Sequence, residues 1–173
     1  MSTFLGRTAR GSMLALGLTA VASAQGPAQQ RDLLDGTWRL NVARSDMTGP
    51  SASSSETVVF KVRGDVESFE SHAVQAADGA REHTGYKATY GGPPAAMASI
   101  YVLPSGVVSR VDLGRSQVVR TDAHTRERLV VDGNGRTLMR ALRKISADGN
   151  TLTSTLLGAD GKPMQTRVFE RVE

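Results

Sequence analysis

The stretch that decides the fold is Leu34-Asp35-Gly36-Thr37-Trp38-Arg39-Leu40-Asn41-Val42, which carries the only tryptophan of the chain. Trp38, Leu40 and Val42 share one side of an extended segment and polar residues take the other, the period-two pattern of a half-buried strand. We predict that this is the first strand of an antiparallel barrel, with the indole closing one end of the core. The alternative places Trp38 in a ligand cavity. A plug is favoured because a buried indole ring needs only one partner for its N–H.

The N-terminus has the three parts of an export signal. Arg7 and Arg10 precede an apolar run from Met13 to Ala22, and small residues end the run at Ala22-Ser23-Ala24. This pattern predicts a signal peptide over residues 1–24, cleaved after Ala24. The run is shorter than the ~20 residues of a membrane-crossing helix, which argues against an anchor. We therefore expect a periplasmic or secreted bacterial protein with no stable membrane insertion after cleavage.

Composition limits what the exported chain can be. Removing 24 of the 173 residues leaves 149, enough for one domain, and lowers the formal net charge from +4 to +2. So small an excess of base predicts no nucleic-acid partner. The chain has no cysteine, so its stability must come from the core without disulfides. We divide the mature chain into an N-terminal arm over residues 25–35 and a barrel domain over residues 36–173.

Beyond the first strand the chain consists of short extended segments separated by turns. Residues 45–55 are rich in serine and predict a long loop. In the last third, Asp132-Gly133, Asp148-Gly149 and Asp160-Gly161 separate strand-forming runs, and Asp-Gly is typical of tight hairpins. No window after residue 35 shows helical periodicity. We predict an all-β, antiparallel up-and-down meander barrel of about 8–10 strands, closed by pairing of the last strand with the first. A Greek-key sandwich is the alternative.

The segment Gly36-Thr37-Trp38 resembles the G-x-W motif that opens the first strand of the lipocalins and the wider calycin superfamily. The stretches at residues 36–45 and 144–153 are similar to those of small exported bacterial proteins of unassigned function with lipocalin-like domains. The resemblance implies that a basic side chain of the last strand, Arg171 or Arg167, packs across the Trp38 ring as a cation–π contact.

The chain also departs from the lipocalin pattern. Thr121-Asp122-Ala123 lacks the aromatic residue of the T-D-Y motif, and no C-terminal helix is evident. These departures leave open a ten-stranded calycin similar to the fatty-acid-binding proteins.

Five aromatic residues are candidates for a ligand cavity. Tyr86 and Tyr90 share parity and therefore one face of a strand. If that face points inward, they line a cavity with Phe60 and Phe69; if it points outward, they are only strand formers. Small residues between positions 85 and 92 leave space, which favours the cavity. The candidate ligand-binding residues are Tyr86, Tyr90, Tyr101, Phe60 and Phe69; the structural motif is Gly36, Trp38 and Arg171.

Two histidines are candidate metal ligands. If residues 76–79 form a four-residue turn, Gln75 pairs with Ala80, and His72 lies opposite His83 at a spacing that can share a metal. A two-residue turn would make them a diagonal pair. A site needs a third ligand, and the chain has neither H-x-H nor H-E-x-x-H. Surface histidines are the favoured interpretation, and we assign no metal.

The sequence supplies no catalytic group. The segment Asp122-Ala123-His124-Thr125 is best explained as a turn capped by Asp122, because the chain has no G-x-S-x-G elbow to offer a nucleophile. We assign no catalytic residue and no cofactor, and we expect a protein that is not an enzyme.

The leading hypothesis is a barrel that binds a small, mainly hydrophobic molecule, with one or two contacts from Arg or Tyr. The alternatives are a structural or protein-interaction module of the cell envelope without an internal ligand, and a hydrolase or metal-dependent enzyme.

Overall fold

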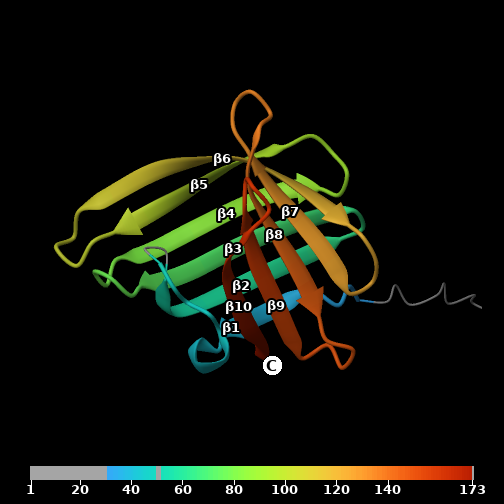
Figure 1. Cartoon of the computed structure of the whole chain (residues 1–173), viewed down its shortest axis with the longest axis horizontal. Coiled ribbons are helices and arrows are strands. Elements are labelled where there is room, and N and C mark those ends of the chain that lie inside the picture. The colour runs from blue at the N-terminus through green and yellow to red at the C-terminus, as the bar shows by residue number, and fades with distance from the viewer. Residues whose placement is uncertain (1–30, 50–51, 173) are drawn as a thin grey trace, which may run out of the picture. The chain divides into compact units, whose positions relative to one another are not determined.

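The computed structural model describes residues 31–49 and 52–172, in which ten strands form one antiparallel barrel (Figure 1). The strands are β1 (Gly36–Leu40), β2 (Ser53–Arg63), β3 (Val66–Gln75), β4 (Arg81–Thr89), β5 (Ala95–Val102), β6 (Val108–Arg120), β7 (Thr125–Val131), β8 (Thr137–Ile145), β9 (Thr151–Gly158) and β10 (Pro163–Val172). A single helical turn, η1 (Val42–Arg44), follows β1. The predicted signal peptide lies outside the described residues.

The strand order confirms the predicted meander barrel. Each strand pairs with its neighbours in the sequence, and β1 also pairs with β10, so that the sheet closes. The order of the strands around the barrel is therefore their order along the chain, as the colours of Figure 1 show. This arrangement excludes the Greek-key sandwich. Over the described residues, no helix is long and apolar enough to cross a membrane.

Trp38 seals one end of the barrel. The residue is fully buried, and its indole Nε1 donates to the carbonyl oxygen of Leu34 at 3.0 Å. The guanidinium of Arg171, which lies opposite Trp38 on β10, is 4.1 Å from the centroid of the indole ring. The same guanidinium donates to the carbonyl oxygens of Gly149 at 2.7 Å, Asp35 at 2.9 Å and Leu33. Arg171 therefore ties the lead-in segment and the β8–β9 turn to the ring.

Gly36 is required by this arrangement. Its φ of +145° lies in a region that L-residues with a side chain rarely adopt. A Cβ at this position would lie 2.6 Å from Nη1 of Arg171. The glycine of the G-x-W motif thus makes room for the arginine that covers the tryptophan.

The structure corrects the prediction for Val42. β1 ends at Leu40, and Val42 is 45% exposed instead of sharing the core face with Trp38. The cause is Asn41, whose side chain accepts a hydrogen bond from the N–H of Arg44 at 3.1 Å and so starts η1. A local side-chain bond here overrides the alternating pattern.

The boundaries on either side of β1 also differ from the predicted ones. Leu34, in the predicted arm, is fully buried in the core. The predicted loop at residues 45–55 is shorter, because β2 already begins at Ser53, which lies opposite Gln75 of β3. Serine-rich composition favours a loop, but backbone pairing with β3 extends the strand.

The three Asp-Gly turns join consecutive strands as predicted. Gly149 and Gly161 have positive φ angles of 73° and 78°. At Asp132-Gly133 the positive φ, 80°, falls instead on Gly135. The N–H of Gly135 donates to the carbonyl oxygen of Asp132 at 3.1 Å, as Gly149 and Gly161 donate to Ser146 and Gly158 in the other two turns. Asn134-Gly135 therefore takes the place that Asp-Gly has in those turns.

Replacing Arg171 should test the seal. Arg171→Met leaves three backbone carbonyl groups without their donor and removes the cation from the indole face, so we expect a loss of about 2–3 kcal/mol in the free energy of unfolding. Urea titration followed by Trp38 fluorescence measures it. Arg39→Met on β1, where the arginine is exposed and makes no hydrogen bond or ion pair within the described residues, should stay within about 0.5 kcal/mol. Equal effects of the two variants would contradict the seal.

Asp35 gives the fold a predictable acid sensitivity. Its carboxylate accepts from the N–H of Val62 at 3.2 Å, Nε of Arg31 at 3.0 Å and Nη1 of Arg63 at 3.3 Å. Burial raises the pKa of Asp35, but the bond from Val62 and the two arginines outweigh burial and bring the pKa below its usual value. The ionised group therefore stabilises the fold at neutral pH, and this contribution disappears as the pH falls through the lowered pKa.

The corresponding experiment compares Asp35→Asn with Asp46→Asn. The free energy of unfolding of the wild type should fall more steeply between about pH 5 and pH 2 than that of Asp35→Asn. Asp46 is exposed and has no ion pair in the described part of the chain, so Asp46→Asn should keep the slope of the wild type. If Asp35→Asn also kept that slope, the carboxylate would have no part in acid stability.

Candidate functional site

The barrel contains a cavity of about 740 Å³. This volume lies within the range of small-molecule sites. The wall combines apolar side chains such as Val58, Phe60 and Leu152 with a few charged ones. Trp38 is not part of this wall, which agrees with its place under Arg171.

Next to the cavity, β6 separates from β7. β6 pairs with β5 from Val108 onward but with β7 only from Arg115 onward, and the two strands diverge in Figure 1. Gly114 lies at the divergence with a φ of +90°, and a Cβ there would lie 2.5 Å from the carbonyl oxygen of Val131. A side chain at this position would therefore collide with the last residue of β7.

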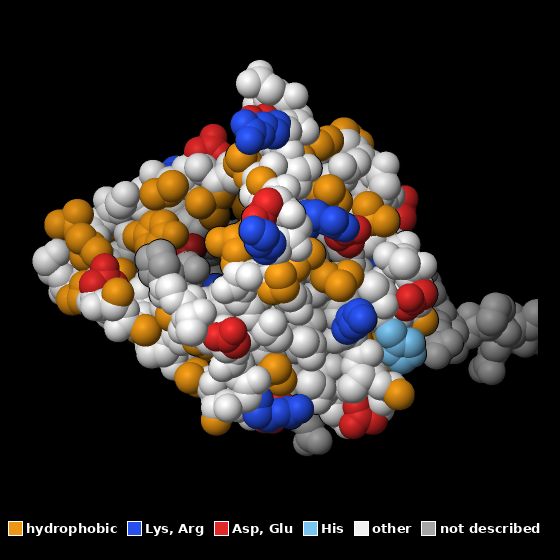
Figure 2. Space-filling view, viewed as in Figure 1, with side chains coloured by type: hydrophobic (Ala, Val, Ile, Leu, Met, Phe, Trp, Pro, Cys, Tyr) orange, Lys and Arg blue, Asp and Glu red, His pale blue; other side chains and the backbone are white. Residues whose placement is uncertain are grey.

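The mouth of the cavity lies between the β3–β4 turn and the β5–β6 hairpin. The exposed wall residues Ala77 and Asp78 come from the turn, and Ser109 comes from the hairpin. Figure 2 shows hydrophobic side chains gathered over the projecting hairpin at the left of the view. The exposed apolar residues of that hairpin are Ile100, Leu103, Val107, Val108 and Val111.

Three of the five predicted ligand-binding residues line the cavity. They are Phe60, Phe69 and Tyr101. Tyr86 and Tyr90 also point inward, but both hydroxyl groups are bound by Glu67, and neither residue belongs to the cavity wall. The aromatic rings form a continuous row, with centroid distances of 5.2 Å between Phe60 and Phe69 and 5.1 Å between Phe69 and Tyr86.

Glu67 is a fully buried carboxylate behind the wall of the cavity. It accepts from the hydroxyl groups of Tyr86 at 2.5 Å and Tyr90 at 2.6 Å, and from Nη1 of Arg143 at 2.9 Å. Burial and the charge of Glu67 raise the pKa of both tyrosines above the usual value, so that both remain neutral donors. The network is complete, and it holds Tyr86 away from the open space.

A second carboxylate, Glu82, faces the cavity near its mouth. It accepts hydrogen bonds from the hydroxyl groups of Ser99 at 2.6 Å, Thr84 at 2.9 Å and Tyr101 at 2.9 Å, and from the amide of Gln75. Burial followed by the bond to Glu82 raises the pKa of Tyr101. Its donors therefore satisfy this carboxylate within the protein.

Four buried or half-buried arginines point to the interior, and three of them have a carboxylate partner. The pairs are Arg126 with Asp32 at 2.9 Å, Arg143 with Glu67 at 2.9 Å, and Arg167 with Glu56 at 2.8 Å. The partners compensate most of the cost of taking these cations out of water.

Arg128 of β7 is the exception. It is 8% exposed and lines the cavity, yet no carboxylate of the described residues lies within ion-pair distance. Its Nη1 meets the sulfur of Met97 at 3.5 Å, and its Nε has no hydrogen-bond partner. The guanidinium lies 5.6 Å from the ring centroid of Phe69 and 5.7 Å from that of Tyr86. Burial and then the charge of Arg143 lower the pKa of Arg128 to about 10, so it is still a cation at neutral pH.

The sequence carries a signal for these buried charges, which the aromatic residues by themselves do not reveal. Arg128 shares parity with the inward-facing Val130, and Glu67 shares parity with the inward-facing Phe69. An isolated charge on the core face of a predicted strand marks a buried ion pair or a binding group. The pairing partners come from other strands, so the sequence could not show which of these charges stays uncompensated.

The predicted register of the two histidines is confirmed. The N–H of Gln75 donates to the carbonyl oxygen of Ala80 at 2.8 Å, which closes a four-residue turn, and His72 lies directly opposite His83. Both histidines are exposed on the outer face of the barrel, away from the cavity.

A scan against models of protein families and a search of curated proteins find no match to this chain. The class that the fold and the site define is a closed, ten-stranded, antiparallel β-barrel with an internal, partly charged cavity. This architecture is consistent with a calycin-like fold.

Two buried arginines should respond in opposite ways to the same substitution. Arg128→Met removes a buried cation with an unsatisfied Nε, so we expect the free energy of unfolding to rise by about 1 kcal/mol. Arg143→Met leaves the carboxylate of Glu67 buried without its cation and should cost about 3–5 kcal/mol. Urea unfolding of both variants measures the contrast. A loss of stability in Arg128→Met as large as that in Arg143→Met would show that Arg128 is compensated after all.

Proposed function

We propose that the barrel binds a small, mainly hydrophobic molecule that carries one anionic group, and that Arg128 pairs with this group. The observation that carries the proposal is the combination of a largely apolar cavity with one buried cation that has no carboxylate partner. We propose further that the protein is a lipocalin-like binding protein and not an enzyme, and that it acts after export. The proposal of export rests on the N-terminal sequence alone.

The energetics favour a ligand with a charge. Arg128 is buried to all but 8% of its surface before any ligand enters, so much of the cost of removing its guanidinium from bulk water already falls on the folded protein. A carboxylate brought into the cavity by an apolar chain would give this cation a partner and would place the chain against Phe69 and Leu152. A neutral molecule of the same shape would leave the cation uncompensated, so the site should discriminate by charge.

The other buried charges cannot take this role without breaking existing bonds. Arg143 is already bound to Glu67 and to the Tyr86 hydroxyl, and Arg167 to Glu56. A ligand that used either of them would displace a buried carboxylate. Arg128 is the group that gains most from a ligand.

The apolar β5–β6 hairpin favours a second candidate, a protein-interaction module of the cell envelope. Its exposed valines, Val107 and Val108, are 56% and 64% exposed. Such a module would have no need of an internal cavity, however, and a packed interior would make it more stable. The size of the cavity therefore favours ligand binding as the main function.

Paired ligands that differ only in charge test the proposal. We expect the protein to bind a fluorescent long-chain carboxylate more tightly than the alcohol of the same chain. Arg128→Met should weaken binding of the carboxylate by about tenfold to a hundredfold, the equivalent of one charge-assisted hydrogen bond of about 1.5–3 kcal/mol. Binding of the alcohol should change little. Fluorescence titration at fixed ionic strength measures all four affinities.

The control is Arg110→Met, because Arg110 is exposed on β6 and does not line the cavity. This variant should bind both ligands as the wild type does. If the wild type bound neither ligand, or bound both equally, the proposed role of Arg128 would be wrong. Equal weakening by Arg110→Met would point to attraction by the general surface charge.

A further inference from the structure

We propose that Glu70, His72 and His83 form a binding site for a divalent transition-metal ion of the Zn²⁺ class on the outer face of the barrel. The site would supply two imidazole nitrogens and one carboxylate oxygen. It is independent of the cavity and of the function proposed for it.

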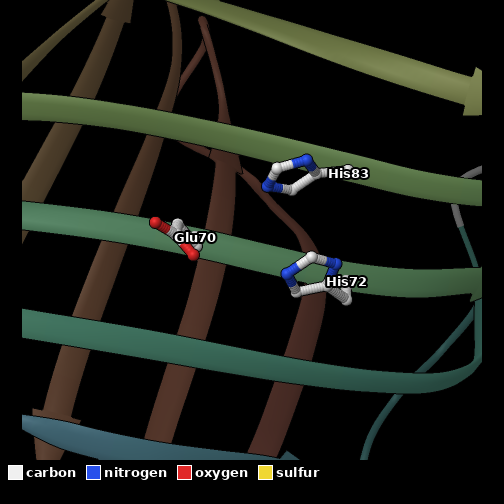
Figure 3. A group of neighbouring side chains, drawn as sticks. All are labelled: Glu70, His72 and His83. Atoms are coloured by element: carbon white, nitrogen blue, oxygen red, sulfur yellow. The ribbon is translucent and has the colours of Figure 1, made fainter.

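The β3–β4 hairpin brings the three side chains together. His72 of β3 and His83 of β4 lie opposite each other in the strand register, and Glu70 lies two residues before His72 on the same face of β3. One potential ligand atom from each residue lies within 4.8 Å of those of the other two. Figure 3 shows a nitrogen of each ring directed toward the side on which Glu70 lies.

None of these side chains is engaged elsewhere. Within the described residues, the carboxylate of Glu70 and both imidazole rings make no hydrogen bond and no ion pair. The contact between the two rings is a stack, with centroids 4.4 Å apart and planes inclined by 9°. An ion would therefore compete with water and with this stack, because the rings must turn out of their parallel contact before a nitrogen of each can meet the same ion.

The residue opposite Glu70 leaves space beside the carboxylate. That residue is Gly85, the partner of Glu70 in the register of β3 and β4. A Cβ at position 85 would lie 3.9 Å from Cγ of Glu70 and 3.3 Å from the carbonyl oxygen of Phe69. Glycine at this position therefore places no side chain beside Glu70 on β4.

The donor set indicates the class of ion. Imidazole nitrogen is a preferred ligand of Zn²⁺, Cu²⁺ and Ni²⁺, whereas Ca²⁺ and Mg²⁺ prefer oxygen ligands. With zinc–ligand distances of about 2.0–2.2 Å, ligand atoms of a tetrahedral site are about 3.3 Å apart. Atoms that lie up to 4.8 Å apart must therefore draw together by as much as about 1.5 Å. Exposed side chains can do this by small rotations. Three protein ligands leave the fourth position for water or an outside ligand.

The site shares its strands with the wall of the cavity. Ser71 and Ala73 alternate with Glu70 and His72 along β3, and they point inward to the cavity wall. An ion bound outside would pin β3 to β4 next to the cavity mouth. This placement makes the ion a candidate clamp for the hairpin, which the binding experiment can examine through thermal stability.

Calorimetric titration with Zn²⁺ tests the site on protein purified without a histidine tag. We expect one ion per chain, bound at micromolar concentration, and a higher melting temperature with the ion than without it. His72→Ala and His83→Ala should each weaken binding by at least about tenfold, because each removes one of three ligands. Glu70→Gln should weaken it by about three- to tenfold. Mg²⁺ should bind to none of these proteins.

His124→Ala is the matched control. His124 is the remaining histidine of the chain, and it lies in the β6–β7 turn outside the cluster. This variant should bind Zn²⁺ as the wild type does. Because His72, His83 and Glu70 are exposed, their substitution should leave the urea midpoint unchanged, which a parallel unfolding curve checks.

Three results would overturn the proposal. One is the absence of a heat signal with wild type at millimolar Zn²⁺. Another is undiminished binding in the double variant of His72→Ala and His83→Ala. The third is equal weakening by His124→Ala, which would indicate nonspecific binding to histidines.

Discussion

The structure depends on the closure of the sheet by a five-residue strand. β1 pairs with β2 on one side and β10 on the other, although it is the shortest strand in the described residues. Few backbone hydrogen bonds hold so short a strand, so side chains must supply the rest of the stabilisation. Trp38 and Arg171 do this, because the ring is buried and the guanidinium over it bonds to three carbonyl groups from two other segments. This contact therefore adds to the backbone pairing that leaves the first and last strands without free edges.

Closure also creates an interior in which a buried charge destabilises the fold unless it has a partner of opposite charge. Inward positions on adjacent strands form a common surface, and long basic side chains can reach acids on the far wall. Arg143 of β8 reaches Glu67 of β3, and Arg167 of β10 reaches Glu56 of β2. The first pair spans the barrel, whereas the second joins the two strands that flank β1. Arg128 differs because it fits the same interior without a partner, which is a cost to folding unless a ligand brings the missing charge.

Local signals in the sequence were sufficient to predict the architecture. Alternation around Trp38 and the Asp-Gly turns predicted strands and hairpins, and consecutive hairpins imply a meander that can close. Prediction failed where one side chain changed the backbone, as Asn41 does after β1. Such bonds depend on one atom meeting one N–H group, and an average propensity does not contain them.

The residues that line the cavity were harder to predict from the sequence than the architecture was. Phe60, Phe69 and Tyr101 were found because aromatic residues of suitable parity are expected inside a barrel. Tyr86 points inward as expected, but it is held by Glu67 from the neighbouring strand β3. Whether an inward side chain meets open space or another side chain depends on its pairings with side chains of other strands, which no pattern within a single strand specifies.

The β3–β4 turn connects the two proposed sites through one geometric rule. In a strand, successive side chains alternate between faces, so a register shift of one residue would exchange the inner and outer sets of β4 relative to β3. The four-residue turn sets the register that places Tyr86 beside Phe69 inside and His83 beside His72 outside. A turn shorter by one residue would put His83 against the apolar wall and Tyr86 in water, while His72 on β3 would stay outside. The inner aromatic row and the outer pair of histidines are therefore two consequences of the same turn, and neither arrangement can be changed there without losing the other.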